Sequence, residues 1–239
     1  MLSQKGLPHP VRVPTEPEEA DRQVLRLREQ LVRKSHSVQK QIKAFLLQHG
    51  IAEPAGLANW SKRAVEELRQ LELEAELRFC LDVLLDEREH AERQVTRVTR
   101  RLEELAHAER HREVARVLRS VPGVGLITAM SFRLEVPEPA RFATAEQVAS
   151  LLGLAPQVRQ SGPTRREGGL LKAGNGRLRT VLVEAAWWWV AGDEVAAARY
   201  RRLVANTGSS QKAVVGMARR LGILLWKLSV SGEVYRMTA

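Results

Sequence analysis

The sequence has little cysteine and no long apolar run, and both absences narrow the class of protein. Cys80 is the only cysteine in 239 residues, so the chain forms no internal disulfide and offers no zinc-ligand spacing. We expect Cys80 to be a small buried side chain. No apolar run reaches about 18 residues, the length that spans a bilayer, and residues 1–10 lack the apolar core of a signal peptide. These absences predict a cytoplasmic protein with no membrane partner.

Histidine and acidic residues are missing from particular segments. All six histidines precede Arg112, so a serine–histidine hydrolase centre in the second half of the chain has no support. No Asp or Glu lies between Arg199 and Lys227, where seven basic residues stand, and segment 159–179 has six basic residues against Glu167. These two segments account for the whole net charge of +10. Charge concentrated in this way predicts a nucleic-acid-binding surface.

Segment 160–179 combines one hydroxyl with glycines and cations. Ser161 lies on a glycine-flanked turn, and the cations around it are Arg165, Arg166, Lys172, Arg177 and Arg179. Small side chains and positive charge suit a polyanionic backbone that approaches the main chain closely. The alternative is a turn serine without chemistry. Because Lys172 precedes the last glycine, the segment does not match the phosphate loop of nucleotide-binding proteins.

Two long helices are predicted before this segment. Thr15–Glu18 has the spacing of a capping box, and apolar residues then recur every three or four positions until Gly50. A second helix is predicted from about Ser61 to Arg110. Its residues Ala91, Val95, Val98, Leu102 and Leu105 keep the four–three spacing of a coiled coil. An antiparallel hairpin of the two helices and pairing with a second subunit both fit this pattern.

The fold predicted from these patterns is mainly α. It has an irregular lead-in over 1–14, long coiled-coil helices over 15–112 and a compact helical domain over 113–239. Within that domain, residues 118–129 have the layout of a helix-hairpin-helix element, in which Gly123 and Gly125 allow a tight turn. Backbone N–H groups at such a turn can hold a phosphate. A bare helix–helix turn explains the same residues.

The last helix of the chain is amphipathic. Lys212, Arg219, Arg220 and Lys227 lie within an arc of about 100° on a helical wheel, opposite an apolar face, and only Ile223 breaks the pattern. A membrane surface is an alternative partner for such a helix; the basic loop around Ser161 favours a nucleic-acid backbone. The consecutive tryptophans at 187–189 cannot all face one side, so they predict a core or subunit interface, with base stacking as the alternative.

Several of these pieces, taken in order, resemble one family. The pieces are Val121–Gly125, Arg141–Phe142, Leu152–Pro156, Gln160–Gly162, Lys172–Arg179 and the final basic helix. Together they are similar to the C-terminal domain of the DEDD-type insertion-sequence transposases, serine-dependent recombinases guided by a bridge RNA. The resemblance covers about residues 118–235, and the preceding helices look like the coiled-coil region of that family.

The resemblance implies an enzyme of DNA transposition and recombination. Its catalytic serine maps onto Ser161, which would attack a DNA phosphate. Its implied partners are DNA, a guide RNA (the bridge RNA) and a second copy of the chain bound through the coiled coil. The residues expected to bind nucleic acid are Gly123, Gly125, Arg165, Arg166, Lys172, Asn175, Arg177, Arg179, Lys212, Arg219, Arg220 and Lys227.

The chain departs from the family before Thr15. The family has an N-terminal RuvC-like domain that holds magnesium through four acidic ligands, and residues 1–14 leave no room for it. Asp82, Asp86 and Glu87 lie on the predicted long helix, so we expect no metal or cofactor in this chain. The expectation is a C-terminal fragment, from a truncated gene, a mis-called start or a split protein. The alternative function is a non-catalytic, coiled-coil-dimerising nucleic-acid-binding remnant.

Overall fold

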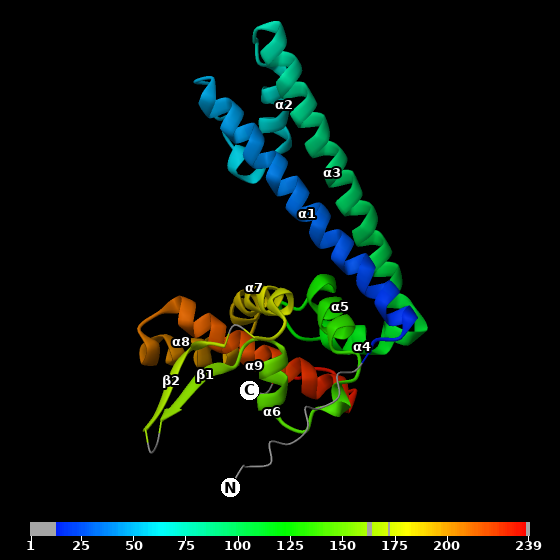
Figure 1. Ribbon diagram of the computed structural model, residues 1–239, viewed down its shortest axis with the longest axis vertical. Coiled ribbons are helices and arrows are strands. Elements are labelled where there is room, and N and C mark those ends of the chain that lie inside the picture. The colour runs from blue at the N-terminus through cyan, green and yellow to red at the C-terminus, as the bar shows by residue number, and fades with distance from the viewer. Residues whose placement is uncertain (1–12, 162–163, 172, 238–239) are drawn as a thin grey trace. The chain divides into compact units, whose positions relative to one another are not determined.

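A computed structural model describes residues 13–161, 164–171 and 173–237, and the side chains of 158–161 and 164–167 lie outside this description (Figure 1). The described chain is mainly α-helical, as predicted, and forms two compact units, Val24–Leu105 and the remainder. The elements are α1 (Glu16–Gln48), η1 (Leu57–Asn59), α2 (Lys62–Gln70), α3 (Ala75–His107), α4 (Glu109–Arg119), α5 (Leu126–Glu135), η2 (Pro139–Arg141), α6 (Ala145–Leu151), β1 (Pro156–Ser161), β2 (Thr164–Leu170), α7 (Gly176–Gly192), α8 (Glu194–Thr207) and α9 (Ser210–Ser231).

The unit Val24–Leu105 is a helical hairpin in which α1 and α3 lie side by side (Figure 1). Ile42 and Leu46 of α1 pack with Leu81 and Leu85 of α3, and all four are buried. Each pair is four residues apart and therefore lies on one face of its helix. Of the two predicted arrangements, the structure shows the hairpin within one chain. Pairing with a second subunit stays a prediction.

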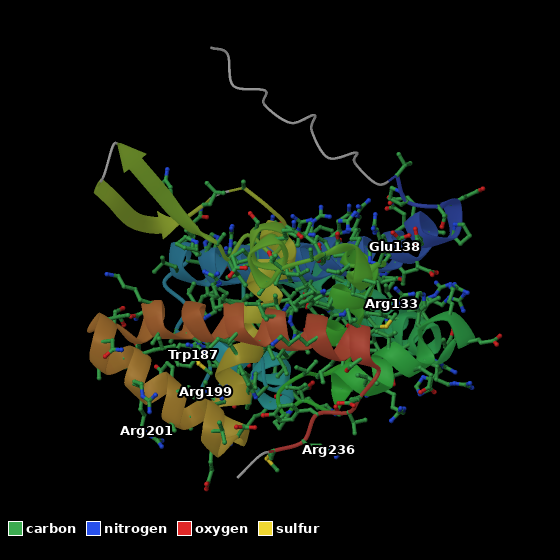
Figure 2. All side chains as sticks on the ribbon, turned by 90° about the horizontal axis from the view of Figure 1, so that it is seen from below. Arg133, Glu138, Trp187, Arg199, Arg201 and Arg236 are labelled. Carbon is green, nitrogen blue, oxygen red and sulfur yellow. The ribbon has the colours of Figure 1, made fainter. Side chains whose placement is uncertain are left out.

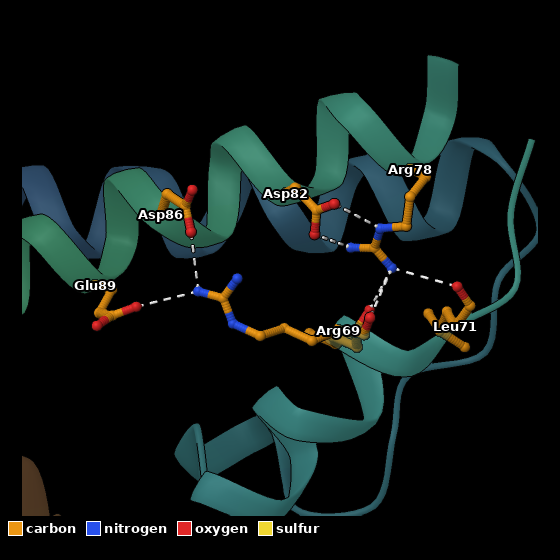
Figure 3. Close-up of polar contacts among 7 residues, drawn as sticks. Arg69, Leu71, Arg78, Asp82, Asp86 and Glu89 are labelled. Carbon is orange, nitrogen blue, oxygen red and sulfur yellow. Dashed lines mark hydrogen bonds and ion pairs between the residues drawn. The ribbon is translucent and has the colours of Figure 1, made fainter. Parts of the chain in front are cut away.

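The single long helix predicted from Ser61 to Arg110 is wrong, because the chain leaves the helix between α2 and α3 (Figure 3). Arg78 Nη1 donates to the carbonyl oxygens of Leu68 at 2.8 Å and Leu71 at 3.3 Å. The same guanidinium holds Asp82 through two bonds of 2.6 and 3.0 Å. These bonds satisfy carbonyl groups that the end of α2 leaves unpaired. Apolar spacing does not report such a cap, and so the break escaped prediction.

Cys80 is exposed, which corrects the prediction of a buried side chain. It stands one position before the buried Leu81 on α3, and successive residues of a helix point about 100° apart. Composition alone favoured burial; the position of Cys80 on α3 decides against it.

The second unit is built around α9, which packs against α4, α6, α7 and α8. Its core contains Phe132, Leu182, Met217 and Leu221, each with no exposed surface. Gly222 of α9 lies so close to the Leu152 side chain that a Cβ there would overlap it. This close packing fixes α9, and with it the basic face predicted from the helical wheel.

Segment 156–170 is a β-hairpin, where the sequence predicted a loop. β1 pairs antiparallel with β2, with Ser161 opposite Thr164 and an irregularity between Pro156 and Val158. The segment has few β-branched or aromatic residues, and periodicity does not report pairing between neighbouring strands. At about 3.3 Å per residue, β1 carries Ser161 about 17 Å from Pro156. The serine therefore lies at the end of a strand.

Candidate nucleic-acid interface

The charge on α8 and α9 is concentrated and unneutralised. These two packed helices carry seven cations and no carboxylate between residues 199 and 227. Six of the seven are exposed and Arg219 is half-buried. Within the described residues, none of the seven has an ion pair or a side-chain hydrogen bond. The cations are Arg199, Arg201, Arg202, Lys212, Arg219, Arg220 and Lys227.

Many cations of the unit Val24–Leu105 are in the opposite situation. Lys34 lies 2.7 Å from Glu87, and Arg93 lies 2.6 Å from Glu89. The cations paired in this unit are Lys34, Lys43, Arg63, Arg69, Arg78, Arg88, Arg93, Arg100 and Arg101. Paired charges cancel each other's field, whereas unpaired cations attract phosphate. The α8–α9 surface is therefore the stronger candidate for nucleic-acid contact.

The two glycines predicted to bind phosphate, Gly123 and Gly125, have different surroundings in the turn between α4 and α5. Gly123 has a φ of +79°, and a Cβ there would lie 2.5 Å from the Trp189 nitrogen. Backbone conformation and packing against α7 therefore account for this glycine. Gly125 caps α5 without a side-chain hydrogen bond, and a Cβ there would have open space within 4 Å. The start of α5 thus keeps N–H groups without a capping side chain, which suits a phosphate.

The three tryptophans of α7 point to different surroundings. Trp189 is buried at 3% exposure, while Trp188 is 69% exposed and lines a shallow hollow with the α4–α5 turn. Trp187 packs edge-on against Tyr200 of α8, with ring centroids 5.7 Å apart. The prediction of a core position holds for Trp189. Trp188 presents an exposed ring beside the open start of α5.

Asn175 and Arg179 make intramolecular contacts at the start of α7. The Asn175 Oδ1 accepts from the Leu178 N–H at 3.1 Å, and its Nδ2 donates to Glu135 at 2.8 Å. Arg179 Nη1 donates to the Gly153 carbonyl at 3.2 Å. These bonds tie α7 to the ends of α5 and α6, so both side chains have a structural task.

The remaining predicted residues of segment 160–179 are only partly described. Gln160 pairs with Arg165, and Arg159 with Arg166, across the hairpin; the side chains of Ser161, Arg165 and Arg166 lie outside the described residues, as does all of Lys172. Arg177 is exposed near the start of α7. Ser161 therefore sits at the end of the hairpin, and Asn175 and Arg179 serve the junction of α5, α6 and α7.

Sequence reasoning missed the contribution of α8. Arg199, Arg201 and Arg202 contribute to the basic segment 199–227, but they lie on a different helix from the amphipathic α9 and are not among the residues predicted to bind nucleic acid. Arg201 follows Arg199 by two residues and Arg202 follows Arg201 directly, so the three side chains point in different directions around α8. Figure 2 labels Arg199 and Arg201 on this helix. Arg199 shares a hollow with Arg220 and Lys227 of α9. Packing of α8 on α9 creates this grouping.

The described residues do not fit the magnesium that the family resemblance implies. In this part of the chain no three His, Cys, Asp or Glu side chains form a group able to hold a metal ion. Asp82 pairs with Arg78, and Asp86 with Arg69. Across the same residues, no helix is both long and apolar enough to cross a membrane.

Comparison with known proteins shows that the chain is similar to transposases. Residues 115–201 match the model of the Transposase IS116/IS110/IS902 family. Two proteins of Sinorhizobium fredii, named "Putative transposase y4qE" and "Putative transposase y4rJ", are 29% and 30% identical over 92% and 94% of this chain. The transposase for insertion sequence element IS1111A of Coxiella burnetii is 25% identical over 90% of the chain. The matches span 59%, 61% and 60% of these relatives.

Proposed function

We propose that this chain, whose segment 115–201 matches the Transposase IS116/IS110/IS902 family model, acts in DNA transposition as a site-specific recombinase. Its substrate would be DNA, held by the α8–α9 cations and the start of α5. A guide RNA and a second copy bound through the coiled-coil helices would be its partners. The chain spans about 60% of the relatives, so these activities belong to the proposal.

The observation that carries the proposal is the unneutralised charge on α8 and α9, next to a family match that ends within α8. Each cation that meets a phosphate releases a counterion, which gives sequence-independent affinity. Backbone amides at the start of α5 would add contacts that position the duplex without reading bases. Binding of this kind suits a protein that brings DNA to a nucleophile.

The nucleophile in the proposal is Ser161. Its hydroxyl oxygen would form a bond to a backbone phosphorus, and the bond from that phosphorus to one deoxyribose oxygen would break. The deoxyribose oxygen would leave as a hydroxyl after taking up the proton that the serine loses. One phosphodiester replaces another, so the step needs no external energy source, and reversing it joins strands. Neighbouring arginines would stabilise charge on the phosphate during the transfer.

The test is a covalent protein–DNA adduct, detected on a denaturing gel. The chain is supplied with the N-terminal region of a longer relative and incubated with insertion-sequence DNA. Ser161→Ala should abolish the adduct, whereas Ser150→Ala, at an exposed serine of α6, should leave it unchanged. Equal adduct yield from both variants would remove Ser161 from this role. DNA binding with no adduct from the unsubstituted chain would instead favour the non-catalytic, nucleic-acid-binding alternative.

A further inference from the structure

A hollow of about 310 Å³ lies where α7, α8, α9 and the C-terminal segment meet. Arg199, Arg220 and Lys227 stand around it and are exposed. Ile223 and Leu224 of α9 also line it and are half-buried. Three cations thus surround an apolar surface. Ile223, the residue that breaks the amphipathic pattern of the last helix, lies between two of these cations in the sequence and shares their hollow.

The polar groups at the hollow make no ion pair with its three cations among the described residues. Tyr235 also lines it, and its hydroxyl donates to Asp193 Oδ2 at 2.7 Å. The other oxygen of Asp193 accepts from the Ala196 N–H at 2.8 Å. The Asp193 carboxylate therefore caps α8 and holds Tyr235. The three cations have no ion pair with any described residue, so the hollow favours an anion.

The shape and the lining suit a nucleotide whose base is unpaired. A bare phosphate would use the cations but not the apolar surface of Ile223 and Leu224. In a duplex the bases are stacked inside the helix and cannot reach such a surface. A volume near 300 Å³ lies at the lower limit of ligand pockets, which is enough for one nucleotide and too little for a base pair.

We propose that this hollow binds one unpaired nucleotide, with its phosphate on Arg199, Arg220 and Lys227 and its base on Ile223 and Leu224. The proposal rests on the proposed nucleic-acid function and specifies its substrate: a junction between duplex and single strand. DNA and RNA share the required chemistry. A single-stranded extension on a duplex would place its first unpaired nucleotide in the hollow while the duplex lies on the remaining cations.

The test compares a 20-base-pair DNA duplex with the same duplex carrying five unpaired nucleotides, as DNA in one arm and RNA in the other. Burying about 55 Å² of apolar base surface at about 25 cal/mol per Å² corresponds to about tenfold in affinity, so the unsubstituted protein should bind the extended duplex about tenfold more tightly. Arg199→Gln and Lys227→Gln should lose this ratio. Arg201→Gln and Lys212→Gln are the matched controls, since they remove the same charge from the same helices outside the hollow, and should keep it.

The outcomes distinguish failure of the nucleotide site from failure of the proposed nucleic-acid binding. Equal affinity of the unsubstituted protein for both duplexes, or an equal ratio in the hollow and control variants, would overturn the nucleotide site and leave duplex binding intact. A ratio lost only in the hollow variants supports it, and the arm with the larger ratio identifies DNA or RNA. No binding to either duplex would overturn the proposed function together with the site. Thermal unfolding confirms that all four variants fold.

Discussion

Nε2 of the buried His111 lies 2.8 Å from Oδ2 of Asp21, and this contact joins α4 to the first turns of α1. Arg110 donates two further bonds of 2.7 and 2.8 Å to the same carboxylate. A carboxylate only accepts, so Nε2 carries the ring proton when the histidine is neutral. Burial lowers the pKa of His111 below its ordinary value, and the bond to Asp21 opposes this shift only in part.

Acidification should destabilise the protein through His111. In the unfolded chain this histidine takes up a proton below a pH of about 6.5, but in the folded chain it resists the proton because its pKa is lowered. Its contribution is therefore present above pH 6.5 and is lost as the pH falls below it. We expect the unfolding temperature to fall between pH 7.5 and 5.5 by more in the unsubstituted protein than in His111→Gln. Equal falls would contradict this role.

Asp21 should make the stability of the protein depend on pH in more acidic solutions. Burial raises the pKa of Asp21, but the hydrogen bonds from Arg110 and His111 outweigh it and hold this pKa below its ordinary value. The stability that Asp21 contributes is therefore complete above its unfolded pKa near 3.9 and is lost as the pH falls through the lower folded value. Asp21→Asn should flatten the acid limb of the stability curve below pH 4, while the histidine effect above pH 5 persists.

Gly123→Ala should destabilise the second unit. The residue has a φ of +79°, and its new Cβ would press on the backbone of Trp188 and Trp189. We expect a loss of about 1–3 kcal/mol in the free energy of unfolding, because neither backbone can move freely. Gly125→Ala is the control, since a Cβ there meets nothing within 4 Å, and it should cost less. Denaturant titration measures both; equal losses would mean that the turn tolerates the change.

Arg78→Ala tests the break between α2 and α3. Loss of the bonds to Leu68, Leu71 and Asp82 leaves carbonyl groups unpaired, and we expect about 1–3 kcal/mol of destabilisation. Arg63→Ala removes an exposed ion pair with Glu67 and should cost less than about 0.5 kcal/mol. Chemical denaturation followed by circular dichroism compares them. An Arg78 variant as stable as the Arg63 variant would show that the cap contributes little.

Most of the helical architecture follows from the sequence, because apolar spacing and caps are local signals. Helix α1 begins at the predicted capping box, where the Thr15 N–H donates to the Glu18 carboxylate at 2.9 Å. The break at Arg78 did not follow, since a side chain ten residues away closes the end of α2. The β-hairpin was not predictable from the sequence either, because neither strand alone has a composition that favours β-structure, and the hydrogen bonds that stabilise it join the two strands.

The positive charge of the candidate site was predictable from the sequence, but the full set of residues that form the site was not. The basic face of α9 follows from a helical wheel, but Arg199 joins it only through the packing of α8 on α9. Asn175 is predicted to contact nucleic acid, and its bond to Glu135, 40 residues away in the sequence, adds a structural task that the sequence does not reveal. Long-range contacts of this kind leave no local signature.

Asn175→Ala separates its structural task from the predicted one. The variant loses the cap on α7, which is worth about 1 kcal/mol, and the bond to Glu135. We expect a lower free energy of unfolding and an unchanged salt dependence of DNA binding. Arg177→Ala, at an exposed neighbour, should reduce the salt dependence, because Arg177 is proposed to meet a phosphate. A reduced salt dependence in the Asn175 variant would show that Asn175 also contacts nucleic acid, as the sequence predicts.

If the α8–α9 cations meet nucleic-acid phosphates, duplex binding must weaken with salt through these cations. The slope of log affinity against log salt changes by about 0.9 for each phosphate contact. Replacing Lys212, Arg219 and Arg220 together by Gln should make the slope shallower by up to about 2.7. The control replaces Arg63, Arg93 and Arg100, which are paired with glutamates, and should leave the slope unchanged. Equal slopes in both triple variants would mean that the α8–α9 cations do not meet phosphates.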